Sequence, residues 1–230
     1  MNDIDQQIKT VRQQIAAAEH TCQRTGQVTL LAVSKTKPIL AIKQAYQVGQ
    51  RAFGENYVQE GVDKIITCQQ AQWLESPIEW HFIGPLQSNK SRLVAEHFDW
   101  VQTIDRAKIA QRLNEQRPVD KPPLNVCIQI NISGEASKSG IALTEVESLA
   151  ELIGTLPQLR LRGLMTIGTP GNAQQEFPLM QQIFEKLKVH YPAIDTLSMG
   201  MTADMAQAIQ YGSTLVRIGS AIFGERDYHH

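Results

Sequence analysis

The chain has 230 residues, of which 42% are hydrophobic and 20% charged, and its formal net charge is -1 at pH 7. These values are typical of an ordinary globular protein, and the length suits one α/β barrel domain. Because Lys and Arg are scattered, the charge pattern excludes a nucleic-acid surface and a polybasic membrane anchor. No signal-peptide pattern or run of about 20 apolar residues is present, so we predict a cytoplasmic protein outside the membrane.

The first predicted element is an amphipathic helix within residues 1–25. Apolar residues recur there at helical spacing, at Ile4, Ile8, Val11, Ile15 and Ala18, and the helix is expected to end before Gly26. It precedes the repeating part of the chain.

Eight short apolar runs then follow one another, each separated from the next by enough residues for a helix. The predicted strands are Val28–Val33, Arg51–Phe53, Trp80–Ile83, Trp100–Thr103, Leu124–Ile130, Leu159–Ile167, Thr196–Met199 and Leu215–Ile218. Eight alternations predict a closed (β/α)₈ TIM barrel with an extra N-terminal helix. We expect residues 1–230 to form one domain, with no room for a second.

A doubly wound sheet has the same alternation, but its usual marker is a glycine-rich turn after the first strand. The turn here reads Ser34-Lys35-Thr36-Lys37-Pro38, and neither GxGxxG nor a P-loop occurs. Nucleotide-binding folds therefore lose their main support.

The cysteines and the terminal histidines carry no site prediction. Cys22, Cys68 and Cys127 form no metal-ligand or disulfide pattern, and no metal is expected. Cys127 lies in an apolar run, where a buried thiol is a better interpretation than a nucleophile. His229 and His230 are either native or the remnant of a purification tag.

Lys35 follows the first predicted strand, at the end of the barrel that carries active sites. A partly desolvated amine has a lowered pKa and can attack an aldehyde, which indicates Schiff-base chemistry. The alternative is a lysine that points into solvent beyond the strand. Lys37 has the same alternation but precedes Pro38, so we interpret it as a charge on the rim.

Arg217 lies inside the apolar strand Leu215–Ile218, where an unpaired guanidinium is costly to bury. One interpretation is a buried salt bridge to a carboxylate. The other is a donor to a ligand nitrogen; Arg stays protonated, so it would leave a pyridine nitrogen unprotonated.

Two segments with glycines and hydroxyls follow the seventh and eighth strands, a place where barrels often bind phosphate. They are Ser198-Met199-Gly200-Met201-Thr202 and Gly219-Ser220, and a helix is expected to start near Ala203. Each could be an ordinary turn, but together with Lys35 and Arg217 they outline sites for a phosphate, an aldehyde and a ring nitrogen.

Three further residues give weaker signals. Asn56, just past the second strand, could face the ring, although Asn after Gly is usually turn chemistry. His81 is interpreted as a core histidine, because no paired carboxylate marks it as activated. Lys138, in Ser137–Gly140, lies on the barrel lip, where a solvated loop is the simpler interpretation.

The chain resembles the pyridoxal 5'-phosphate (PLP) homeostasis proteins, single-domain barrels related to the cofactor domain of alanine racemase. The resemblance covers nearly the whole chain. The segments that carry it are Ala32–Thr36, Phe53–Tyr57, His81–Lys90, Lys138–Gly140, Leu164–Met165, Leu197–Thr202 and Val216–Gly219.

The resemblance implies that Lys35 forms a covalent aldimine with PLP and that Arg217 faces the pyridine nitrogen. It also implies that Ser198–Thr202 and Gly219-Ser220 hold the phosphate. Thr202 stands where serine is usual in the family, which keeps the hydroxyl.

The family is understood to bind PLP and to buffer or deliver it, without an established reaction of its own. We therefore predict a non-enzymatic monomer with no catalytic residues. Its expected partners are PLP, other B6 vitamers and recipient apo-enzymes. A racemase of this fold takes a tyrosine from a second domain, for which the chain has no room. A PLP-dependent racemase or lyase and a cofactor-free aldolase using Lys35 are the alternatives, the aldolase leaving Arg217 without a purpose.

Overall fold

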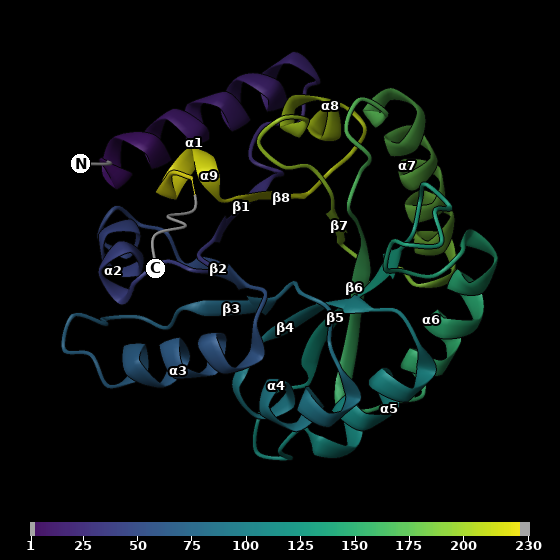
Figure 1. The fold of residues 1–230 in the computed structure, drawn as a ribbon. Helices are drawn as coiled ribbons and strands as arrows, with labels where there is room; N and C mark the ends of the chain where they lie inside the picture. Colours follow the sequence, from purple (N-terminus) through teal and green to yellow (C-terminus); the bar gives the residue numbers. More distant parts are fainter. Residues whose placement is uncertain (1–2, 226–230) are drawn as a thin grey trace.

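Eight parallel strands close into a barrel, and the helices surround it in the computed structural model, which describes residues 3–225 (Figure 1). The strands pair in chain order, and β1 closes the ring by pairing with β8. In that closing pair Leu31 lies opposite Arg217. The predicted (β/α)₈ barrel is confirmed.

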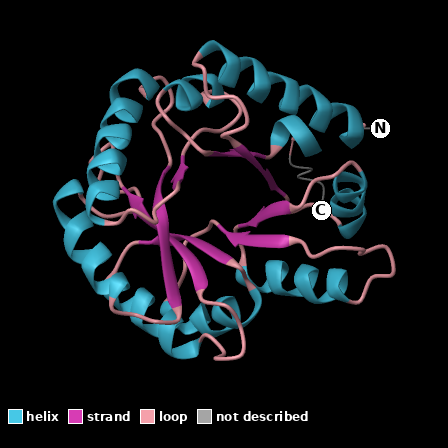
Figure 2. Cartoon of the chain, turned by 180° about the vertical axis from the view of Figure 1, so that it is seen from behind, coloured by secondary structure: helices cyan, strands magenta, loops and turns pink. Residues whose placement is uncertain are grey.

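The strands are β1 (Thr29–Val33), β2 (Ala52–Glu55), β3 (Glu79–Phe82), β4 (Trp100–Ile104), β5 (Leu124–Ile130), β6 (Leu159–Thr166), β7 (Thr196–Ser198) and β8 (Leu215–Ile218). The helices are α1 (Ile4–Thr21), α2 (Ile39–Gln47), α3 (Val58–Gln69), α4 (Ser91–His97), α5 (Ala107–Gln116), α6 (Val146–Gly154), α7 (Ala173–His190), α8 (Met205–Gln210) and α9 (Ser220–Phe223). Two short 3₁₀ helices, η1 (Ser88–Lys90) and η2 (Leu143–Glu145), complete the elements. Seen from behind, the helices again form the outer layer (Figure 2).

The predicted strand bounds need small corrections. The second strand runs on to Glu55, because Gly54 and Glu55 continue the pairing with His81 and Phe82 of β3. The first and second strands each begin one residue later than expected, and the sixth and seventh each end one residue earlier. The third strand lies one residue earlier at both ends, at Glu79–Phe82, and the fourth ends one residue later, at Ile104. The helix expected to start near Ala203 starts at Met205, with Asp204 as its N-cap.

Helix α1 is the extra element, and it packs outside the barrel against α2, α8 and α9. Its apolar face is buried, including Ile8 and Val11. The buried carboxylate of Glu19 accepts the N–H groups of Gly26 and Val28, at 3.2 and 2.7 Å, and thereby fixes the entry to β1. The predicted helix within residues 1–25 is confirmed.

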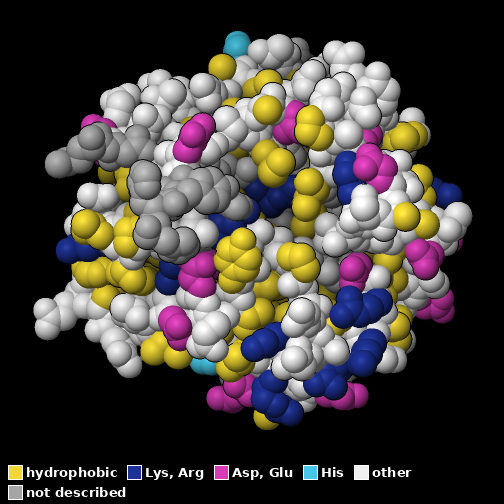
Figure 3. All heavy atoms as spheres, viewed as in Figure 1, with side chains coloured by type: hydrophobic (Ala, Val, Ile, Leu, Met, Phe, Trp, Pro, Cys, Tyr) yellow, Lys and Arg dark blue, Asp and Glu magenta, His cyan; other side chains and the backbone are white. Residues whose placement is uncertain are grey.

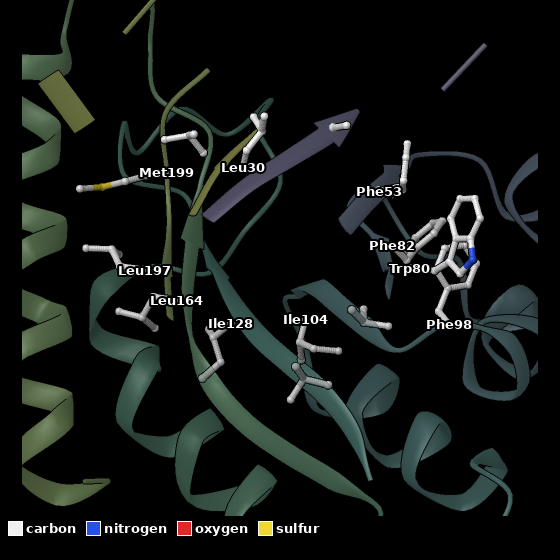
Figure 4. Packing of buried hydrophobic residues seen from close by; sticks show 14 of the residues in the cluster. Leu30, Phe53, Trp80, Phe82, Phe98, Ile104, Ile128, Leu164, Leu197 and Met199 are labelled. Atoms are coloured by element: carbon white, nitrogen blue, oxygen red, sulfur yellow. The ribbon is translucent and has the colours of Figure 1, made fainter. Parts of the chain in front are cut away.

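The main core lies between the sheet and the helices. Outward-facing aliphatic and aromatic side chains fill it, among them Phe53 against Trp80 and Phe82 against Phe98 (Figure 4). Burial of such side chains is the dominant stabilising contribution.

The barrel interior is different, because polar side chains share it with apolar ones. His81, Gln102, Ser198 and Arg217 are all buried there, beside small apolar clusters such as Leu31 with Ile83. Buried polar groups require partners, so this interior must contain a hydrogen-bond network.

Within residues 3–225, no helix has the length and apolarity needed to cross a membrane.

Candidate functional site

A cavity of about 580 Å³ opens at the carboxyl ends of the strands. The described residues that line it are Val33, Lys35, Thr36, Lys37, Asn56, Ile83, Ile167, Met201, Thr202, Ala203, Arg217, Gly219, Ser220, Gly224 and Glu225. Three of these side chains are basic and one is acidic, so the lining favours an anionic ligand. On the face drawn in Figure 3, basic side chains gather near a central hollow among hydrophobic ones.

Lys35 lies two residues beyond β1, half-buried, on the wall of this cavity. Its neighbour Thr36 adopts a left-handed backbone conformation, with φ of 64°, which is uncommon for a residue with a branched side chain. The Thr36 N–H donates to the Glu60 carboxylate at 2.6 Å. This bond holds the turn that carries Lys35.

A buried cation secures the other side of the turn. Lys64 of α3 donates to the backbone oxygen of Ser34 and to the carboxylates of Glu55 and Glu60, each at 2.7 Å. Burial raises the pKa of Glu55, and the charge of Lys64 opposes that rise. The backbone on both sides of Lys35 is therefore fixed to one ionic cluster, Lys64–Glu55–Glu60.

Arg217 reaches the cavity from β8 with its side chain almost fully buried. It donates to Ser198 Oγ at 2.7 Å and to the backbone oxygen of Thr166 at 2.8 Å. Burial lowers the pKa of Arg217 to about 10, so the guanidinium stays charged at neutral pH.

No carboxylate in residues 3–225 forms an ion pair with Arg217. The alternative interpretation of a buried salt bridge is therefore not supported by the described contacts. The hydrogen-bond partners of the guanidinium, Ser198 and Thr166, are neutral, and Asp204 acts on its charge without a direct contact.

Only part of the two predicted phosphate segments lines the cavity. Thr202, Gly219 and Ser220 line the cavity, and Met201 joins them. Ser198 is fully buried and directs its hydroxyl into the barrel interior, where it meets Arg217 and Gln102. Met199 is buried in the main core, and neither it nor Gly200 lines the cavity.

Asn56 lies on the cavity wall immediately after β2, as expected from its position. Its side-chain oxygen is buried and has no hydrogen-bond partner among the described atoms. Leaving such an atom unpaired costs about 1–3 kcal/mol, so it is suited to accept a bond from a ligand.

The other two lysines differ from the sequence interpretation in detail. Lys37 lines the cavity and donates to the backbone oxygen of Glu225 at 2.9 Å, so it is more than a charge on the rim. Lys138 lines a neighbouring cavity of about 200 Å³, and its amine contacts Thr169 and Glu135.

The interpretation of His81 was wrong in one respect: a carboxylate is paired with it. Glu79, two residues earlier on β3, accepts from His81 Nε2 at 2.7 Å. Residues two apart on a strand point to the same face, so the alternation contained this signal. Gln102, which bonds to both His81 and Ser198, was missed altogether.

Cys127 is fully buried, as predicted, and burial raises the pKa of its thiol to about 12. A protonated, inaccessible thiol is a poor nucleophile.

The fold and the site define a class: α/β barrels with a lysine after β1 and an arginine in β8. The family model described as the alanine racemase N-terminal domain matches residues 7–227. Relatives over essentially the full length are named pyridoxal phosphate homeostasis protein. That of Escherichia coli K12 is 60% identical, covering 99% of each chain, and that of Pseudomonas aeruginosa is 51% identical, covering 99% of this chain and 98% of its own. The chain belongs to the pyridoxal phosphate homeostasis protein family.

Solved structures agree with this assignment. PipY of Synechococcus elongatus PCC7942, with PLP bound, superposes with a TM-score of 0.83 at 31% identity, covering 96% of this chain and all of PipY. Alanine racemase from Corynebacterium glutamicum has a TM-score of 0.67 at 17% identity, covering 94% of this chain and 62% of its own, which shows a shared fold.

Proposed function

We propose that this chain binds PLP in the cavity, holds it covalently as a Schiff base on Lys35, and releases it to other proteins without catalysing a reaction. The observation that carries the proposal is the meeting of Lys35, Arg217 and a hydroxyl-lined rim around one cavity. The name of the family and the PLP found in PipY support it.

The residues present fit the cofactor. The Asn56 side chain lies on the cavity wall with an unpaired amide oxygen, so it can bond to a polar group of a ligand there. The basic lining suits a phosphate, and Thr202 and Ser220 add hydroxyl donors at the rim. When bound, PLP supplies an aldehyde that condenses reversibly with an amine.

Each residue then has a distinct task. Lys35 supplies the amine, on a turn whose backbone the Lys64–Glu55–Glu60 cluster holds. Arg217 donates toward the ring nitrogen and keeps it unprotonated, which weakens the ring as an electron sink. We further propose that Thr202, Gly219 and Ser220 hold the phosphate, whereas Ser198 acts through Arg217.

We further propose that the protein does not turn over amino acids. A racemase needs an acid/base on each face of the substrate carbon. No tyrosine or histidine is among the described residues that line the cavity. We also propose that the chain is a single domain, works as a monomer in the cytoplasm, and accepts related B6 vitamers.

The test is to load the protein with PLP, remove the free cofactor, and follow retention together with reactivation of an apo-enzyme. Lys35→Ala should release PLP faster while circular dichroism shows an intact fold. The matched control is Lys108→Ala, which removes an exposed lysine of α5 and should behave as wild type.

Two results would contradict the proposal. Retention by Lys35→Ala equal to that of wild type would show that Lys35 is not the tether. Saturable racemisation of an amino acid by wild type, lost in Lys35→Ala, would favour a racemase.

A further inference from the structure

A hydrogen-bond chain runs through the barrel interior, from the cavity to the opposite end. It begins at Arg217, whose NH1 lies 2.7 Å from Ser198 Oγ. Ser198 Oγ lies 2.6 Å from Gln102 Oε1, and Gln102 Nε2 lies 2.9 Å from His81 Nδ1. His81 Nε2 lies 2.7 Å from Glu79 Oε1. Four different strands contribute to this chain.

The side chains of this hydrogen-bond chain are buried, except at the end formed by Glu79. Ser198, Gln102 and His81 are fully buried, and Arg217 is nearly so. The Glu79 side chain is half-exposed at the start of β3, where it lines a second cavity with Arg162 and Asp195. Inside the barrel each polar group must therefore find its partner within the chain.

The two ends determine the direction of every bond. The hydrogen bond from His81 lowers the pKa of Glu79, so that carboxylate only accepts, and His81 Nε2 must carry the hydrogen. Burial lowers the pKa of His81, and the ring stays neutral with a bare Nδ1. Asp99 and Arg162 are the other charged groups that act on the ring, which stacks on Trp100 at 4.7 Å.

A bare Nδ1 requires Gln102 to present its amide N–H₂ to His81. The Gln102 oxygen then faces Ser198, whose hydroxyl hydrogen points to it and away from Arg217. Ser198 is left as an acceptor for Arg217. In all four bonds the donor is consequently on the guanidinium side and the acceptor on the carboxylate side. Hydrogen bonds aligned in this way polarise and strengthen one another.

We propose that Gln102, His81 and Glu79 are positioning residues for PLP: they fix Ser198 as the acceptor of Arg217 and thereby aim the guanidinium at the ring nitrogen. This inference rests on the proposed function. It extends the cofactor site to residues on β3 and β4 that do not line the cavity.

The first test needs no cofactor and reads the direction of the chain. In ¹⁵N-histidine-labelled protein, long-range ¹H–¹⁵N spectra should show His81 as the Nε2–H tautomer at neutral pH, with the signal assigned by its loss in His81→Gln. A ring that carries its hydrogen on Nδ1 would reverse the bond to Gln102 and overturn the inference.

The second test breaks the chain with Gln102→Leu. The readouts are the ¹⁵N shift of PLP labelled at the pyridine nitrogen and the rate of PLP release. We expect the shift to move toward that of Arg217→Ala and release to quicken by about threefold to tenfold, as for partial loss of a hydrogen bond to a charged group.

Two further variants separate positioning from packing. In Gln102→Glu a side-chain oxygen still accepts from Ser198, so the PLP shift should return toward wild type, while a proton lies between the new carboxyl group and His81 Nδ1. Thr103→Val removes a buried hydrogen bond to Gly84 from the same strand and should leave the PLP shift and the release rate unchanged.

The outcomes distinguish this inference from the proposed function. PLP bound by Gln102→Leu with the wild-type shift and release rate would overturn the positioning role alone. A wild-type protein that binds no PLP would overturn both. Should Gln102→Leu fail to fold, the tautomer of His81 in the wild-type protein decides, because a hydrogen on Nδ1 overturns the inference without any variant of Gln102.

Discussion

Removal of the Lys64 amine should destabilise the protein strongly and in a pH-dependent manner. Lys64→Met deletes three contacts of 2.7 Å and leaves the carboxylate of Glu55 fully buried without its cation. Breaking a buried ion pair on one side costs about 3–5 kcal/mol, so we expect a loss of that size near neutral pH.

The loss of unfolding free energy in Lys64→Met should become smaller as the pH is lowered. Burial already raises the pKa of Glu55, and without Lys64 the pKa in the folded state rises further above that of the unfolded chain. The folded state then holds the extra proton, so stability is present below the unfolded pKa and lost as the pH rises through the folded pKa. The variant should therefore recover part of its deficit between neutral pH and about pH 5.

The assay is urea unfolding of wild type and variant at both pH values. Lys186→Met is the control, because the pair of Lys186 with Glu147 is about three-quarters exposed and its loss should cost less than about 0.5 kcal/mol. A deficit for Lys64→Met below about 1 kcal/mol, or one that is equal at both pH values, would refute the argument.

The other predictions concern the ligands of the cofactor and one glycine. Arg217→Glu should weaken PLP binding by about tenfold or more and shift the bound spectrum toward a protonated ring; an unchanged spectrum and affinity would show a purely structural arginine. Thr202→Ala should weaken binding of PLP but not of pyridoxal, which lacks the phosphate, whereas Ser198→Ala should affect both; equal effects of Thr202→Ala on the two ligands would remove it from the phosphate site. Gly163→Ala should lose about 3 kcal/mol or more of unfolding free energy, because a Cβ would lie 1.7 Å from the backbone oxygen of Thr196, and a wild-type urea midpoint would contradict this.

The sequence predicts the strands of the barrel well, because each strand is a short apolar run that can be recognised without knowing its partners. Alternating apolar runs identified all eight strands, and the ends of β5 and β8 agree with the prediction. The strand positions place Lys35 just after the first strand and Arg217 within the eighth, and the structure brings both to one cavity.

Contacts between distant strands could not be predicted in the same way. Arg217 and Ser198 are 19 residues apart, and Ser198 and Gln102 are 96 apart. The register of the closed sheet brings these side chains together, and no short motif encodes that register. The segment alone therefore predicts a phosphate contact for Ser198, whereas its hydroxyl contacts Arg217 and Gln102 inside the barrel.

The role of Lys64 was hidden for a related reason. A lysine on a helix is usually exposed, and only the packing of α3 on the barrel shows that this one is buried beside Glu55. The pair of His81 with Glu79, in contrast, was accessible from the alternation of β3.

The tether is tested most directly by borohydride reduction of the PLP-loaded protein, followed by mass mapping of the modified peptide. We predict a yellow protein whose reduced pyridoxyl group lies on Lys35. A group found on Lys37, Lys90 or Lys138 instead, or PLP that washes away without a covalent product, would contradict the assignment of Lys35.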